Sequence, residues 1–150
     1  MATYTMYYGD FVSTKDINVV SRQNGEVISK KIRASPYEFT IATRAKWELM
    51  ISDEDVEIRA GEYRKIKVKE VTLDPDTLAI PCAFTYHAVA SVLKIASKEG
   101  NCLVEKERNI RFAYIFGQET GKVREGDLLG VLNIFPIMFT REASMPVVVK

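Results

Sequence analysis

The most chemically distinctive stretch of the sequence surrounds His87, the only histidine. Cys82 and Tyr86 lie just before it, and the surrounding segment 77–93 contains no Asp, Glu, Lys or Arg. A Cys and a His that converge can form a nucleophile and its base, or two ligands of a transition metal. We therefore name Cys82, Tyr86 and His87 as the candidate ligand-binding residues, and assign no catalytic residue.

The same residues also have a simpler, structural interpretation. The spacing of Cys82 and His87 is not that of a standard zinc pair, and Cys102 is the only other soft donor. A packed thiol and a buried imidazole bonded to the backbone would satisfy the pattern, because buried polar groups are normally hydrogen-bonded. We accordingly expect two free thiols, no metal and no cofactor.

Other charged motifs fit the surface of a β protein. Acidic residues at 53–55 are typical of a solvated turn, and the mixed charges at 105–108 suit an edge strand. Every second residue from 65 to 69 is lysine, which predicts the solvated side of a strand. The segment 117–122 lacks both the spacing and the hydroxyl of a phosphate-binding loop.

Composition narrows the class of protein. The 150 residues are 47% hydrophobic and 27% charged, with 21 basic and 20 acidic side chains and a formal net charge of +1. Such a chain can bury a sizeable core without staples, so we expect a single globular domain over residues 1–150. A near-zero net charge argues against a dedicated nucleic-acid binder. No apolar run is long enough to span a membrane, and the opening residues lack a secretory signal, so we expect a cytoplasmic protein.

Hydrophobic periodicity predicts a mainly β fold of short strands, arranged as a β-barrel or a β-clip-like fold. Alternating residues indicate strands near 17–21, 26–32, 37–41, 46–51, 56–58, 63–73 and 110–116. Asn24-Gly25 predicts the tight turn of a hairpin between the first two. The near-continuous apolar run 128–135 predicts a strand buried on both faces.

The segment 84–97 has two interpretations. Its apolar residues fit one short helix that begins near Thr85 and ends at Gly100. They also fit a strand at 92–96 that pairs with 102–105 across a turn, and this hairpin is the interpretation we favour.

Two segments resemble the dUTPase-like β-clip superfamily. Residues 47–68, with Asp55-Val56-Glu57-Ile58 running into a Gly turn, resemble a strand, turn and strand of that superfamily. Residues 123–136, in which Gly126-Asp127 leads into an apolar strand, resemble its closing segment. The resemblance implies a β-clip architecture. It implies no dUTP hydrolysis, because the metal-positioning Asp and the Pro-Arg-Ser loop of dUTP pyrophosphatases have no counterpart here.

A second resemblance covers more of the chain. The run 126–132 and the Glu-Lys-Glu-Arg stretch 105–108 before an aromatic strand resemble an archaeal family known only as a domain of unknown function, number twenty-two. This resemblance implies no activity.

The function we expect is therefore a small-ligand-binding or oligomeric assembly module without dUTPase activity. The alternative is an enzyme that acts on a nucleotide or similar small molecule through a pocket near Cys82, Tyr86 and His87. The partners we expect are a small molecule and a second copy of the chain, with no membrane and no nucleic acid.

Overall fold

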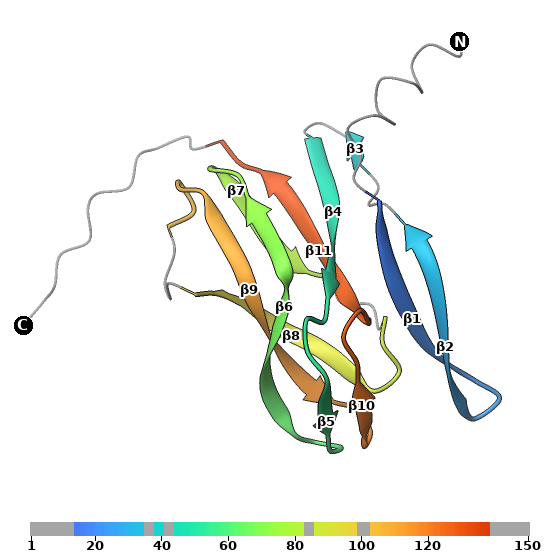
Figure 1. Ribbon diagram of the computed structural model, residues 1–150. Coiled ribbons are helices and arrows are strands. Elements are labelled where there is room, and N and C mark those ends of the chain that lie inside the picture. The colour runs from blue at the N-terminus through green and yellow to red at the C-terminus, as the bar shows by residue number, and fades with distance from the viewer. Residues whose placement is uncertain (1–13, 35–37, 41–43, 83–85, 99–102, 139–150) are drawn as a thin grey trace, which may run out of the picture.

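The structure of the chain, a computed structural model, describes residues 14–34, 38–40, 44–82, 86–98 and 103–138. All regular elements in these ranges are β-strands (Figure 1). In chain order they are β1 (Lys15–Gln23), β2 (Glu26–Ala34), β3 (Glu38–Thr40), β4 (Arg44–Ile51), β5 (Val56–Ile58), β6 (Tyr63–Leu73), β7 (Thr77–Pro81), β8 (Ala90–Ser97), β9 (Arg108–Gly117), β10 (Gly121–Val123) and β11 (Leu128–Pro136).

The strands pair antiparallel in four sheets. The two larger sheets have the strand orders β3-β4-β11-β7 and β6-β9-β8, while β1 pairs with β2 and β10 with β5. The mainly β prediction is confirmed. Among the described strands the sheets are open and packed in layers rather than closed into a barrel.

The main core lies between the two larger sheets. Apolar side chains from both sheets form one fully buried cluster, which is the expected result of packing two amphipathic sheets face to face. The four-stranded sheet contributes Met50, Leu129, Leu132 and Ile134, and the three-stranded sheet contributes Ile66, Val68, Ile110, Ala113 and Ile115.

A second, smaller core lies on the other side of the four-stranded sheet. There the β1–β2 hairpin covers a cluster that contains Ile17, Leu49, Ile51, Leu128 and Val131. Strand β11 is thus the middle of three layers, and its side chains enter the two cores in turn. This position explains the near-continuous apolar run, and the prediction of a strand buried on both faces is confirmed.

The structure decides between the two interpretations of residues 84–97, as far as they are described. Residues 90–97 form strand β8, so the helical alternative is wrong there. The predicted partner at 102–105 is also wrong, because β8 pairs with β9 and residues 103–105 are not in a strand; residue 102 lies outside the described residues. The long, strongly apolar β9 offers a better partner than the charged segment 103–107.

Turns follow the sequence closely. Asn24 and Gly25 have φ of 50° and 83°, the positive values that a two-residue hairpin turn of the predicted kind requires. Gly126, in the turn before β11, has a φ of 89°. No helix in the described part of the chain is long and apolar enough to cross a membrane.

Candidate functional site

His87 points into the protein, not toward solvent. Its side chain is fully buried, and both ring nitrogens are hydrogen-bonded. Nδ1 accepts a hydrogen bond of 3.1 Å from the backbone N–H of Val89, so the proton of the neutral ring must be on Nε2. Nε2 therefore donates to Oδ2 of Asp127, at 2.9 Å. This arrangement fixes one tautomer, and a proton on Nδ1 would break the bond from Val89.

Asp127 connects several segments that are distant in the sequence. Its Oδ2 also accepts a hydrogen bond of 3.0 Å from the backbone N–H of Arg124, and its own N–H donates to the Arg124 carbonyl. The Asp127 carbonyl accepts from the backbone N–H of Ser52, at 2.9 Å, while the neighbouring Gly126 carbonyl accepts from Asn18. The turn before β11 thus joins β1, the end of β4 and the segment before β8.

Cys82 and Tyr86 lie together against the smaller core, whereas the hydrogen bonds of the His87 ring go to Asp127 and Val89. The Tyr86 hydroxyl donates to Sγ of Cys82 at 3.6 Å, and both side chains are half-buried against the smaller core. Burial raises the pKa of the Tyr86 phenol, and the contact with Cys82 adds to the increase. The structure therefore brings two of the three candidate residues into contact with each other and places His87 in a different environment.

Sequence reasoning did not identify Asp127 as the partner of His87. Forty positions separate the two residues, and a Gly-Asp turn opens buried strands in many proteins. The one available signal was the resemblance of segment 123–136, which pointed to the turn but not to its carboxylate.

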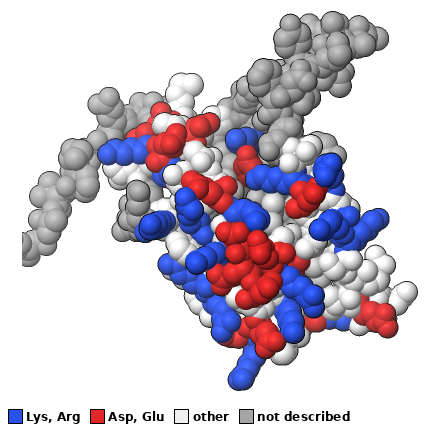
Figure 2. All heavy atoms as spheres, in the orientation of Figure 1, with Lys and Arg blue, Asp and Glu red and all other residues white. Residues whose placement is uncertain are grey.

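The carboxylates at 53–55 belong to a network of surface charges. Lys69 forms ion pairs with Asp53 at 3.1 Å and Glu125 at 3.4 Å, which raise the pKa of the Lys69 ammonium. Asp55 accepts the backbone N–H of Glu125. Figure 2 shows an acidic patch with basic side chains around it. These contacts fit the predicted turn, and no three His, Cys, Asp or Glu side chains converge as a metal site within the described residues.

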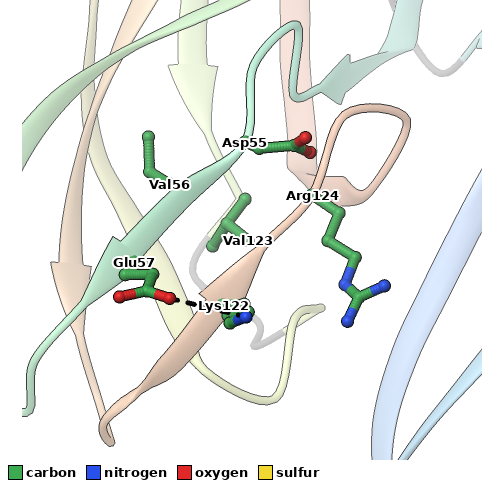
Figure 3. A pocket seen from close by; sticks show the side chains of 6 residues that line it. All are labelled: Asp55, Val56, Glu57, Lys122, Val123 and Arg124. Atoms are coloured by element: carbon green, nitrogen blue, oxygen red, sulfur yellow. Dashed lines mark ion pairs between the residues drawn. The ribbon is translucent and has the colours of Figure 1, made fainter.

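A pocket of about 310 Å³ lies beside this network and is lined by residues of the paired segments 55–57 and 122–124. The first segment contributes two acids around Val56, the second contributes two basic side chains around Val123, and Lys122 pairs with Glu57 at 3.4 Å (Figure 3). A second hollow, of about 420 Å³, lies between the β1–β2 hairpin and the body, where Val20, Val27 and Val89 line it beside Lys122 and Arg124. The candidate residues Cys82, Tyr86 and His87 line neither pocket.

The outer face of the β6-β9-β8 sheet carries a different kind of surface. Phe112, Tyr114 and Phe116 project from β9 at every second position, opposite to the buried Ala113 and Ile115. In the neighbouring strands their cross-strand partners are lysines, an aromatic ring and small residues. We call this surface the aromatic–lysine face, and it comprises Tyr63, Lys65, Lys67, Lys94, Phe112, Tyr114 and Phe116.

The side chains of this face contact one another. The rings of Tyr63 and Tyr114 stack with centroids 5.6 Å apart. The ammonium of Lys65 lies 4.3 Å from the Phe112 centroid, and that of Lys94 lies 5.1 Å from the Tyr114 centroid. Such contacts contribute only about 0.5–1 kcal/mol each at exposed sites, so a ligand can displace them easily.

The lysines of the aromatic–lysine face are not engaged in ion pairs within the described part of the chain. There, no ion pair or hydrogen bond involves the ammonium of Lys65, Lys67 or Lys94. The Glu54 carboxylate accepts the backbone N–H of Lys67 at 3.2 Å, and Arg111 pairs with Glu70 at 2.6 Å. Tyr63 and Phe116 are 48% and 39% exposed, whereas most large apolar side chains of the two sheets are buried. The face therefore combines accessible rings with ammonium groups that form no ion pair.

The fold and these sites define a layered, all-β protein with a buried His–Asp pair and an exposed aromatic sheet face. Comparison with known families places it further: the family described as "Domain of unknown function DUF22" matches residues 16–121, and the chain belongs to this family. The resemblance to the archaeal domain family of unknown function, number twenty-two, is thus confirmed. The matched residues include the whole aromatic–lysine face and end before Asp127.

A relative supports the same assignment. The uncharacterized protein MJ0614 of Methanocaldococcus jannaschii is 28% identical over 109 residues, which cover 71% of this chain and 83% of that protein. No solved structure matches the chain. The function of the family is unknown, so a function for this chain has to be inferred from the geometry of its sites.

Proposed function

We propose that this protein is a non-catalytic binding module, and that it recognises ligands which combine a flat ring with negative charge. The binding site is the aromatic–lysine face. The observation that carries the proposal is the row of three aromatic side chains on β9, flanked on both neighbouring strands by lysines that form no ion pair within the described residues. Flat rings stack on such side chains, and phosphates or carboxylates attract the ammonium groups.

The environment of His87 supports a binding module over the enzyme alternative. A general base needs a ring nitrogen within hydrogen-bond reach of the substrate. Both nitrogens of His87 are bonded inside the core, and no atom of its side chain reaches solvent. An enzyme at Cys82, Tyr86 and His87 would have to open the core before it could exchange a proton with a substrate.

We also propose that the protein does not hydrolyse dUTP, that it is located in the cytoplasm and that it assembles with a second copy of the chain. Assembly is compatible with the edges of the two large sheets, since β3, β7 and β8 each have one side that pairs with no other described strand.

A titration of the purified protein with adenosine monophosphate, followed by isothermal calorimetry, tests the binding site. We expect weak saturable binding that Tyr114→Leu abolishes and Phe135→Leu preserves. Phe135 is the matched control, because it is a half-buried aromatic residue on the other sheet. Equal binding by the Tyr114→Leu variant, or no binding of any planar anion at millimolar concentrations, would contradict the proposal.

A further inference from the structure

We infer that the ligand of the aromatic–lysine face is a single-stranded nucleic acid. This inference rests on the proposed function and names the class of its ligand.

The rings form a continuous row instead of a single stacking site. Phe112, Tyr114 and Phe116 are two residues apart along β9, so the row extends over about 14 Å at about 3.4 Å per residue. Tyr63, which is paired with Phe116 across the sheet and stacked on Tyr114, widens the row at one end. One mononucleotide can occupy only one ring, whereas the splayed bases of a single strand can occupy several in succession.

The charges lie along both sides of this row. Lys65 is the cross-strand partner of Tyr114 on β6, and Lys94 is its partner on β8. Lys67 is the partner of Phe112, so it continues the charge along β6. A stacked strand would place its phosphates beside its bases, within reach of the lysines on one side or the other. The lysines that now lie over the rings would then exchange the ring for a phosphate.

An open sheet surface that carries aromatic rings favours a single strand over a duplex. The base faces of a duplex are stacked on one another and cannot reach the rings, while its phosphates alone could contact the lysines. The near-neutral charge of the whole chain led us to expect no nucleic-acid partner, but a total charge does not report how charge is distributed. Here three lysines that form no ion pair within the described residues surround the rings. Asp53 pairs with Lys69, and the Glu54 carboxylate accepts the backbone N–H of Lys67.

Fluorescence anisotropy with labelled strands of about ten nucleotides tests the inference, since proteins that bind single strands cover about 4–16 nucleotides per site. The probes are mixed-sequence single-stranded RNA and DNA, a duplex of equal length, and heparin. We expect the single strands to bind more tightly than the duplex and heparin. Three phosphate contacts predict a slope of about −2 for the logarithm of the binding constant against that of the salt concentration.

Variants separate stacking from charge. Tyr114→Leu should weaken single-strand binding about 5- to 100-fold, because each base–aromatic stack contributes roughly that factor. Lys65→Gln should reduce the salt slope by about 0.7, whereas Lys30→Gln, an exposed lysine on the β1–β2 hairpin, should leave it unchanged. Circular dichroism confirms that each variant is folded.

The inference is overturned if the duplex or heparin binds as tightly as the single strand, or if Tyr114→Leu binds normally. It is also overturned if sedimentation shows that a second copy covers the face, with dimerisation lost in Tyr114→Leu. If adenosine monophosphate binds at the face but longer strands bind no more tightly, this inference fails and the proposed function stands. If neither binds, both fail.

Discussion

The His87–Asp127 pair and the aromatic–lysine face contrast in how completely their chemistry is used inside the protein. Both ring nitrogens of His87 and Oδ2 of Asp127 have hydrogen-bond partners within the fold, and the two side chains are 0% and 4% exposed. On the face, aromatic rings and lysine ammonium groups contact one another at the surface, and Tyr63 and Phe116 are 48% and 39% exposed. The single histidine of the chain therefore stabilises the fold, whereas the side chains that are available for binding are of common types and lie on the surface of an open sheet.

The largest effect on stability is expected at the buried pair. Asp127→Ala removes the acceptor of the buried Nε2–H of His87, at about 1–3 kcal/mol, and that of the part-buried backbone N–H of Arg124, at about 1 kcal/mol. Urea unfolding should show a loss of about 2–4 kcal/mol. Asp127→Asn is the matched control and should lose less, because its amide oxygen can still accept both bonds. Equal stability of Asp127→Ala and the wild type would show that the pair is not structural.

The next largest effect on stability is expected when alanine replaces Gly117, and a smaller one when it replaces Gly121. A Cβ on Gly117 would lie 2.2 Å from the backbone oxygen of Arg59, while a Cβ on Gly121 would lie 2.8 Å from a methyl group of Val89. A side chain can shift more readily than a backbone, so Gly117→Ala should cost about 3 kcal/mol and Gly121→Ala about 1 kcal/mol. Thermal unfolding measures both, and the reverse order would contradict the close approach of Gly117 to the backbone of Arg59.

Variants of the aromatic–lysine face should affect binding, whereas variants of the His87–Asp127 pair should affect stability. Tyr114→Leu should change the free energy of unfolding by less than about 1.5 kcal/mol, since an apolar side chain of similar bulk remains, but should lose nucleotide binding. His87→Gln should do the opposite, with lower stability and normal affinity at a temperature where it is folded. Loss of binding in His87→Gln, with the fold intact, would favour the enzyme alternative at Cys82, Tyr86 and His87.

The smallest effect is expected at Tyr86 and depends on pH. Burial raises the pKa of its phenol, so the unfolded chain releases this proton at lower pH than the folded protein does. The corresponding stability is present below a pH of about 10 and is lost as the pH rises through the folded pKa. Urea unfolding of the wild type and Tyr86→Phe at increasing pH should show the wild type losing more stability above that pH. Parallel profiles would contradict this environment for Tyr86.

Much of the fold could be predicted because its signals are local. Alternation identified β6 and β9, Asn24-Gly25 identified the first hairpin, and the apolar run identified β11 as a doubly buried strand. Strand β7 was missed because it lies in a charge-free segment that ends at Pro81, and its pairing with β11 is a tertiary effect. Strand β10 was not predicted, since its three residues carry no usable period.

The sites were harder to predict than the strands. The hydrogen bond from His87 to Asp127 depends on a contact between distant turns, which periodicity cannot report. The lysines at alternate positions 65–69 were correctly placed on a solvated side. Their function as neighbours of the β9 rings depends on the register that pairs Lys65 with Tyr114, and register is set by the complete sheet.

Chemical-shift mapping of the backbone amides tests the central claim most directly, that the aromatic–lysine face and not the His87 region binds the ligand. The isotope-labelled protein is titrated with a single strand of about ten nucleotides, within the usual site size. We predict that the largest shifts fall on residues 112–116 of β9 and their partners in β6 and β8, with small shifts at 82–89 and at Asp127. Largest shifts at Cys82, Tyr86 and His87, with β9 unchanged, would contradict it.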